Sequence, residues 1–417
     1  MKGLAHMKTI KTLASMFFAA TLALSAPLAA FAATDITVED TKYTTAANGT
    51  GNGGGTWTWD GQDLLALNNF ISDKELVYTG TLTVALTGEN EVAAINGERE
   101  EIDYSGADTN DWIIDYYVND VGAANTTITS QDCGTLETGK IDIDGGLNVK
   151  NANLTVDYEY TGNAVEFPAA IQVGDLTTEN ATLEVTATKN VSTAEGSVVN
   201  GIRAGSVSFK DSDVNVTVKA AENDIASGIV AQGIGDYIEG ATHNLGNVAL
   251  NNSDVKVSLE PKGVAVTAWG RWMPDGAGLR NGTISIDNSS IAEPDMHVTT
   301  ITDYYGADFQ MLSPVSGSVN GAELLNTEYA SWSKTPYVSS GVSVKGTGPN
   351  GCGSGCSGDC GNRANYAKLA AANVAESMVH ATAKTADDQP IYLLFALAVG
   401  AMVLLAFAAY RLRKGNA

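Results

Sequence analysis

Apolar and polar side chains alternate in short runs through the middle of the chain, and the runs resemble one another. Each run has a polar residue, a small Ala or Ser, one further residue, and then alternating β-branched or leucine positions. A period of two is typical of a strand with one buried face. The pattern therefore predicts strands that repeat along the chain. The runs lie at 150–156, 179–185, 211–218 and 252–259, with a weaker copy at 288–291.

A second apolar phrase precedes these runs, as in Gly201-Ile202-Arg203-Ala204 and Gly228-Ile229-Val230-Ala231. Each repeat thus offers about three short strands, which cannot bury an apolar face alone and are expected to stack as coils. The small residue suits an inward corner, and the Asn or Asp beside it suits a left-handed turn that can stack into polar ladders. We expect an all-β, right-handed parallel β-helix. A sandwich of antiparallel hairpins is the alternative, but regular two-residue Asn-Gly or Asp-Gly connections are missing.

Longer apolar segments lie at the two ends of the chain. Residues 1–32 have Lys8 and Lys11 ahead of an apolar stretch and end in Ala30-Phe31-Ala32, which predicts a cleaved secretory signal peptide rather than an anchor helix.

Residues 391–410 hold no charge, and at ~1.5 Å rise per residue a helix of this length spans a bilayer. The basic tail that follows predicts a cytoplasmic C-terminus. A transmembrane helix is therefore expected here, with a buried core helix as the alternative.

These observations predict a single-pass cell-surface protein with its N-terminal domain outside. Residues 363–386 are rich in Ala and favour a helical stalk that ends before Pro390. The expected order is a signal peptide (1–32), a β-helix ectodomain (33–345), a Gly- and Cys-rich linker (346–362), the stalk (363–386), a transmembrane helix (391–410) and a basic tail (411–417).

Charge narrows the classes of partner. Removing the basic residues of the two ends from the 24 in the chain leaves 18 against 48 acidic residues, a net charge of 18 − 48 = −30 for the exterior part. Such a field repels nucleic acid, anionic lipid and acidic polysaccharide. It favours solubility and weak binding of a divalent cation, and an ordinary acidic surface is the preferred explanation. No cofactor is expected.

The beginning of the exported part carries three phrases in a fixed order: Gly55-Thr56-Trp57-Thr58-Trp59-Asp60-Gly61, Leu65-Ala66-Leu67-Asn68-Asn69 and a longer alternating phrase at 80–90. In this it resembles β-helical, carbohydrate-binding-like surface-anchored proteins of Gram-positive bacteria. The resemblance covers 50–92 closely and 140–292 by its coil pattern. It implies the fold and surface display, but it implies little about the ligand.

The C-terminus also resembles the sorting signals of Gram-positive wall proteins. Ala383 and Thr385 fit the short sortase motif, whereas Ala386 replaces the usual Gly and Thr382 replaces Leu. Simple retention in the membrane is therefore the favoured interpretation, and covalent linkage to the wall is the alternative.

Aromatic residues give the first candidate binding sites. Trp57 and Trp59 share one face of a strand, so they form either a sugar-stacking platform or a buried cap on the solenoid. A Gly-rich segment at 267–280 is a better ligand candidate, as an exposed aromatic loop or as a loop folded over a coil. Its candidate ligand-binding residues are Trp269, Arg271, Trp272 and Asp275.

Cysteines and carboxylates give weaker signals. The C-x3-C-x3-C spacing fits a zinc site only loosely, so disulfides, a metal site and free thiols are all open for Cys133, Cys352, Cys356 and Cys360. Asp142-Ile143-Asp144-Gly145 lacks the further ligand of a calcium loop and is read as a turn.

No residue is predicted to be catalytic, because acidic pairs such as Asp211 and Asp213 match outward polar positions of the repeat. We expect a non-enzymatic display or adhesion protein that binds a glycan or a surface protein. The alternatives are a carbohydrate-active enzyme on the same fold, either a hydrolase or a lyase, and a structural envelope component.

Overall fold

The described part of the chain is built from β-strands. The computed structural model describes residues 33, 35–98, 124–162, 168–191, 197–222, 224–232, 246–269, 282–292, 296–302, 308–314 and 339–347. These residues form 26 strands connected in one large sheet, and no helix occurs among them. The predicted all-β class is confirmed.

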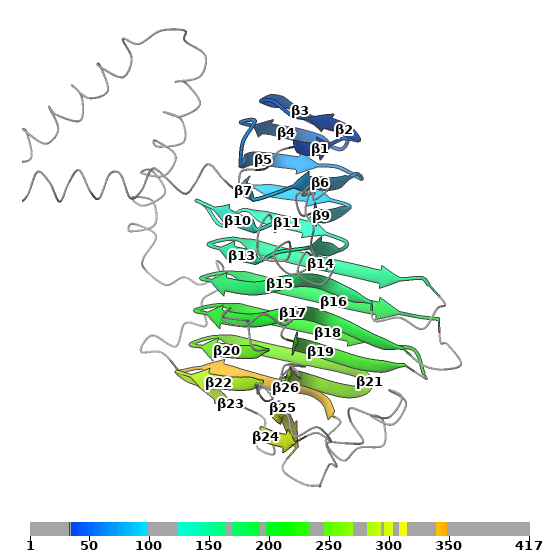
Figure 1. Cartoon of the computed structure of the whole chain (residues 1–417), viewed down its shortest axis with the longest axis vertical. Helices are drawn as coiled ribbons and strands as arrows, with labels where there is room; N and C mark the ends of the chain where they lie inside the picture. The colour runs from blue at the N-terminus through cyan, green and yellow to red at the C-terminus, as the bar shows by residue number, and fades with distance from the viewer. Residues whose placement is uncertain are drawn as a thin grey trace, which may run out of the picture. The chain divides into compact units, whose positions relative to one another are not determined.

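Successive strands stack in three columns, which we call faces 1, 2 and 3 (Figure 1). Face 1 contains β5 (Leu64–Ile71), β7 (Leu82–Thr87), β10 (Thr126–Ser130), β13 (Leu147–Lys150), β20 (Asn247–Asn251) and β22 (Thr283–Asp287). Face 2 contains β8 (Glu89–Val92), β11 (Thr135–Thr138), β14 (Asn153–Tyr160), β16 (Thr182–Lys189) and β18 (Asp213–Lys219). Face 3 contains β6 (Glu75–Thr79), β9 (Ala94–Glu98), β12 (Ile141–Ile143) and β19 (Ile225–Gln232).

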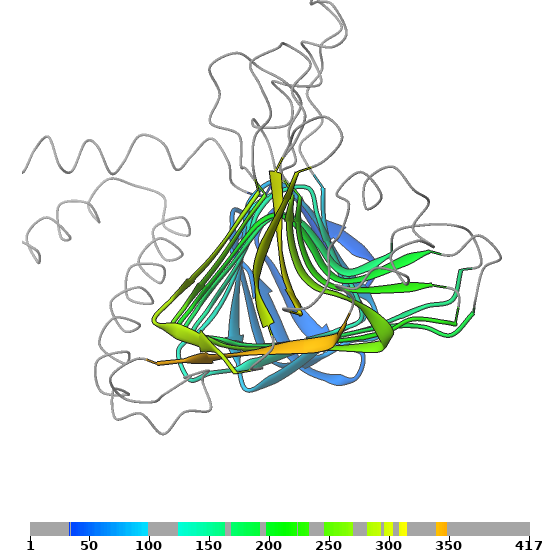
Figure 2. The same cartoon turned by 90° about the horizontal axis from the view of Figure 1, so that it is seen from below.

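Three long strands bend around a corner and belong to two faces. Strands β15 (Ala169–Glu179) and β17 (Val198–Lys210) run from face 3 onto face 1, and β21 (Asp254–Trp269) runs from face 2 onto face 3. Each strand of the middle coils pairs in parallel with the equivalent strand of the next coil. Seen end on, the faces enclose a triangle (Figure 2), an arrangement compatible with a parallel β-helix.

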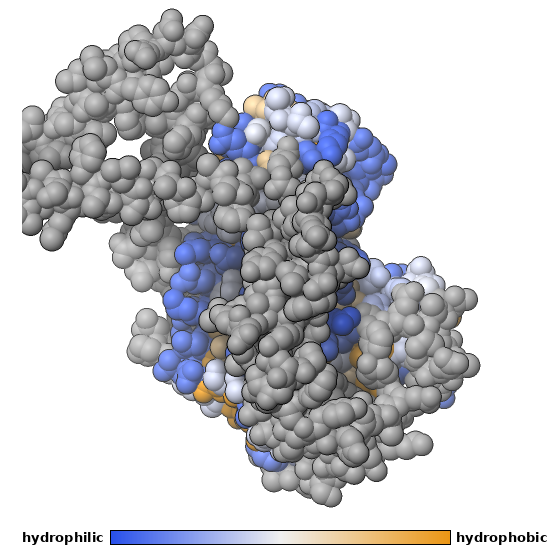
Figure 3. Space-filling view, viewed as in Figure 1, coloured by the Kyte–Doolittle hydropathy of each residue, from blue (hydrophilic) through white to orange (hydrophobic). Residues whose placement is uncertain are grey.

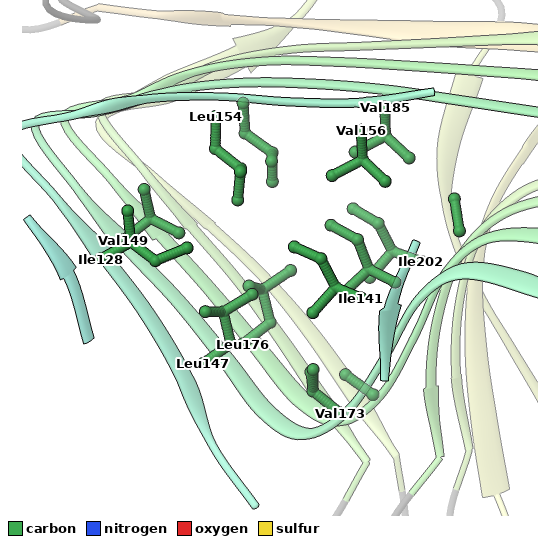
Figure 4. Packing of buried hydrophobic residues seen from close by; sticks show 14 of the residues in the cluster. Ile128, Ile141, Leu147, Val149, Leu154, Val156, Val173, Leu176, Val185 and Ile202 are labelled. Atoms are coloured by element: carbon green, nitrogen blue, oxygen red, sulfur yellow. The ribbon is translucent and has the colours of Figure 1, made fainter. Parts of the chain in front are cut away.

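The triangle is filled by Leu, Ile and Val side chains from all three faces (Figure 4). Equivalent inward positions of successive coils stack on one another. On face 2, for example, Leu154 pairs with Leu183, Leu183 with Val214, and Val214 with Val255, all of them buried. Full burial of such a side chain contributes roughly 1.5–3 kcal/mol, so the stack of coils is the source of stability.

The corner between faces 1 and 2 repeats one residue conformation. In the five coils from β13 to β22, a non-glycine residue with positive φ directly follows the face 1 strand, and a small residue comes next. The small residues Ala152, Ala181, Ser212 and Ser253 have no solvent exposure, as the sequence predicts. The positive-φ residues are Asn151 (53°), Asn180 (50°), Asp211 (49°), Asn252 (47°) and Asn288 (49°).

Side chains at this corner form the predicted polar ladder. Asn180 Nδ2 donates to Asn151 Oδ1 at 2.8 Å, and Asn252 Nδ2 donates to Asp211 Oδ1 at 2.7 Å. Asn and Asp tolerate the left-handed region better than other side-chain-bearing residues, which explains their recurrence.

Antiparallel pairing is confined, among the described residues, to the two ends of the stack. At the N-terminal end β1 (Asp35–Val38) pairs with β2 (Thr41–Tyr43) and β6, and β3 (Ala47–Gly51), β4 (Gly54–Trp59) and β5 form a meander. At the other end β23 (Ser289–Ile291), β24 (Met296–Thr302), β25 (Asp308–Pro314) and β26 (Ser339–Gly346) pair antiparallel with one another or with β21. The middle coils therefore do not form a sandwich of hairpins.

The strands of faces 2 and 3 extend past one corner of the triangle (Figure 2). We call this extension the flange; it comprises the ends of β14, β16 and β18 and the beginnings of β17 and β19. The two layers approach closely, because a Cβ added to Gly201 would lie 2.4 Å from Val216 Cγ1.

The predicted signal peptide, linker, stalk, transmembrane helix and basic tail lie outside the described residues, apart from Gly346 and Thr347 at the start of the linker. Among the residues that the structure describes, no helix is long and apolar enough to cross a bilayer.

Candidate functional site

The first aromatic pair belongs to the core. Trp57 and Trp59 are 2% and 1% exposed, on the inward face of β4, and the Tyr43 ring lies 5.1 Å from that of Trp57. Burial removes both indoles from any ligand, so the sugar-stacking alternative is wrong and the capping alternative is confirmed.

The second aromatic segment begins later than the sequence predicts. Strand β21 continues to Trp269, which pairs with Gln232 of β19, so 267–269 are strand rather than loop. The reason is the parallel neighbour β19, whose pairing with β21 continues as far as Gln232. Arg271, Trp272 and Asp275 lie outside the described residues.

Cys133 occupies the corner between faces 1 and 2. Its φ is 61°, as for the asparagines of the other coils, and its carbonyl accepts a hydrogen bond from Asn153 Nδ2 at 3.1 Å. The residue is disulfide-bonded. Cys352, Cys356 and Cys360 lie outside the described residues.

The Asp142–Asp144 phrase is the end of a strand and the turn after it. Asp142 lies on β12, where it accepts from Lys140 Nζ at 2.7 Å and from Gln172 Nε2 at 3.4 Å. Asp144 begins the bend toward β13. In the described ranges, no group of three or more His, Cys, Asp or Glu side chains is placed to hold a metal ion.

The outward side chains of face 1 form hydrogen bonds from coil to coil. Ser206 Oγ donates to Asp175 Oδ1 at 2.6 Å, and Thr283 Oγ1 donates to Asn247 Oδ1 at 2.7 Å. Figure 3 shows hydrophilic residues over most of the described surface that is visible in that view. Polar side chains of this face thus form hydrogen bonds to neighbouring coils.

Beside the corner, three charges alternate along face 1. Lys150 Nζ and Lys210 Nζ each lie 2.9 Å from one oxygen of the Glu179 carboxylate. Hydrogen bonds from Lys210 and then from Lys150 lower the pKa of Glu179 from 4.5 to about 2. The carboxylate bridges three coils and stays ionised at all ordinary pH values.

Face 2 carries a carboxylate cluster that groups Asp213 with two residues that the sequence did not connect to it. Asp213 of β18 pairs with Asp254 of β21, and Glu184 lies on the neighbouring strand β16. Burial, the Asp254 charge and the Glu184 charge raise the pKa of Asp213, and Lys345 opposes the shift. Asp254 itself accepts from Lys345 Nζ at 3.1 Å and from the Gly346 amide at 2.8 Å.

The structure separates the acidic pair that the sequence places together. Asp211 belongs to the corner ladder, whereas Asp213 lies on face 2 among the carboxylates. Asp213 and Asp254 each follow the small corner residue of their repeat. Aligning the repeats in the sequence would therefore have predicted that the two carboxylates lie side by side. Asp213 and Asp254 thus place two carboxyl groups on neighbouring strands, and glycosidases also use a pair of carboxyl groups.

Comparisons of the chain with models of protein families, with curated proteins and with solved structures found no match. The resemblance to Gram-positive β-helical surface proteins therefore stays a prediction.

Proposed function

We propose that this chain is an exported, non-enzymatic cell-surface protein that displays a right-handed parallel β-helix and binds a glycan or a surface protein. The signal-like 1–32 and apolar 391–410 segments support export and retention in the membrane. Right-handed crossovers are by far the commoner hand between parallel strands, which supports the handedness.

One observation carries this proposal: in the regular coils, both the apolar interior and many of the outward polar groups form contacts that hold the coils together. Their interior is filled by apolar side chains, and many of their outward polar groups bond to the next coil, as Asp175, Asn247 and Glu179 do. Binding then falls to segments inserted between strands, where sequence can vary without disturbing the ladder. The segment after β21, with Arg271, Trp272 and Asp275, is our first candidate.

The remaining segments fit the same proposal. Residues 363–386 would form a helical stalk, and 391–410 a transmembrane helix, with or without covalent linkage to a wall near Thr385. Cys352, Cys356 and Cys360 would lie at the joint between domain and stalk. The alternative is a structural component of the cell envelope that associates with itself and binds no soluble ligand.

A second candidate function rests on the face 2 cluster. The raised pKa of Asp213 beside Asp254 favours a carbohydrate-active enzyme more than the sequence alone does. In that case Asp213 and Asp254, on neighbouring strands of face 2, would be the two carboxyl groups that act on the glycosidic bond.

One binding study separates these proposals. The exported part, residues 33–390, would be applied to a glycan array and to an array of extracellular-matrix proteins. We expect a ligand whose affinity falls at least about tenfold in the Trp269→Ala, Trp272→Ala double variant, as for an aromatic hot spot. Val191→Ala, at an exposed residue two positions after β16, is the matched control.

Three other outcomes would each contradict one part of the proposed function. Undiminished binding by the double variant would remove the segment after β21 as the site. Cleavage of a polysaccharide by the wild type, lost in Asp213→Asn, would replace the display function by the enzyme. Binding to neither array together with ordered self-association would favour the structural component.

A further inference from the structure

The flange contains a lysine and an aspartate that are both shut off from solvent. Lys189 is the last residue of β16, and Asp224 directly precedes β19, which belongs to the next coil. Lys189 Nζ lies 2.8 Å from Asp224 Oδ2, and both side chains have 0% solvent exposure. This is the only described ion pair in which neither partner reaches water.

Further groups hold the pair in a fixed arrangement. The Ser197 backbone N–H donates to Asp224 Oδ1 at 2.8 Å, and Lys189 Nζ donates to Ser197 Oγ at 2.9 Å. The ring of Tyr160 lies 5.9 Å from Lys189 Nζ, measured to its centroid. Ser197 O in turn accepts from the Ile225 amide at 2.8 Å, which ties together the two coils that carry Ser197 and Asp224.

This setting favours amide formation over a permanent ion pair. Desolvating an ammonium and a carboxylate costs roughly several kcal/mol each, and a neutral amide in the same place avoids that cost. With Nζ 2.8 Å from Oδ2, the nitrogen is on the order of 3.5 Å from Cγ, at the edge of near-attack range. Fixed geometry and exclusion of water both favour condensation over hydrolysis.

We propose that Lys189 and Asp224 condense into an intramolecular amide that covalently joins two successive coils. The proposal is independent of any ligand of the protein. It assigns a modification site in a part of the fold that the repeat pattern does not describe.

The reaction needs no further reactant. One proton passes along the hydrogen bond from Nζ to Oδ2, which leaves a neutral amine and a neutral carboxylic acid. The Nζ lone pair attacks Cγ, and negative charge develops on Oδ1, where the Ser197 N–H already donates. The Cγ–Oδ2 bond then breaks, and Oδ2 leaves as water with the transferred proton and a second proton from Nζ.

Two other pairs in the same molecule are internal controls. Lys140 and Asp142 are 2.7 Å apart, and Lys345 and Asp254 are 3.1 Å apart, so proximity alone does not distinguish them from the flange pair. Their side chains are 35% and 38%, and 59% and 26%, exposed to solvent. Hydration keeps both partners charged, and we expect no amide at either pair.

The test is the intact mass of the mature chain, purified from the membrane, after reduction and alkylation of its cysteines. We expect a mass lower by one water than the sequence of the mature chain requires. A protease digest should contain one branched peptide that joins the surroundings of Lys189 and Asp224. No branched peptide should contain Lys140 or Lys345.

Variants identify the bond. Lys189→Arg keeps the positive charge but should recover the full mass and release two linear peptides. Asp224→Asn should condense with loss of ammonia instead of water and give a product of the same mass as the wild-type product. A wild-type chain of full mass with linear peptides only would overturn the proposal and leave a buried ion pair.

Discussion

At the scale of single residues, the stack of coils is specified by a few side chains with special conformations or charges. Asn180 and its equivalents adopt the left-handed turn that closes each corner, and their amides bond to the coil before. Glu179, one residue earlier, joins three coils through its two lysine partners. Neither role requires a ligand, which supports a structural reading of this corner.

The Glu179 ion pairs predict a dependence of stability on pH. The pKa of Glu179 is lowered to about 2 in the folded protein from an ordinary 4.5. Its stabilising contribution is therefore complete above about pH 4.5 and is lost as pH falls through about 2. Because the side chain is 39% exposed, we expect at most about 1 kcal/mol per pair.

Urea unfolding of Glu179→Gln measures this contribution. At pH 7 the variant should have its unfolding midpoint at a lower urea concentration than the wild type. The difference between the two midpoints should vanish near pH 2. Glu137→Gln, at an exposed position of face 2, is the control and should change little. An equal loss at both pH values would mean that packing, and not charge, is responsible.

At the scale of elements, strands and corners follow different rules. A strand requires only alternating apolar residues, so Leu and Val replace one another at equivalent inward positions such as 154, 183 and 214. The corner requires a small residue, because the chain turns inward there. Ser212 Oγ also accepts from Thr178 Oγ1 at 2.9 Å and donates to the Lys210 carbonyl at 2.8 Å.

Enlarging the corner residue should therefore be costly. Ala181→Leu adds three carbons at a position with no exposure, where overpacking destabilises by about 1–3 kcal/mol or more. Chemical denaturation would show a lower midpoint with an unchanged slope. Thr186→Leu, at an outward position of the strand β16 that follows, is the matched control. Comparable losses in both variants would contradict a special demand of the corner.

At the scale of the whole molecule, the open edges of a parallel stack need protection. The N-terminal meander places Trp57 and Trp59 over the first coil, and strands β24 to β26 pair across the other end. An uncovered edge presents unpaired N–H and C=O groups to other molecules. The strands at both ends therefore contribute to the stability of the stacked coils and to their solubility.

Removal of the N-terminal cap tests this role. Deleting residues 35–61 from the exported part removes β1 to β4 and exposes β5, so we expect concentration-dependent association that the complete exported part does not show. Light scattering after size-exclusion chromatography measures it. Trp59→Phe, which keeps the cap, should behave like the wild type; an unassociated deletion variant with unchanged thermal stability would contradict the argument.

The sequence by itself determined the repeating part of this protein. Alternation predicted the strands, the recurring Asn or Asp predicted the left-handed corner, and the small residue after it predicted the inward turn, because each is decided by neighbours one coil away. The family resemblance, the ends of the chain and the ligand remain predictions.

Tertiary structure alone decided the features that do not repeat. It buried Trp57 and Trp59, carried β21 on to Trp269, gathered Glu184, Asp213 and Asp254, and brought Lys189 to Asp224 across two coils. A single sequence carries no periodic signal for such contacts, since each depends on where particular segments meet after the coils have stacked.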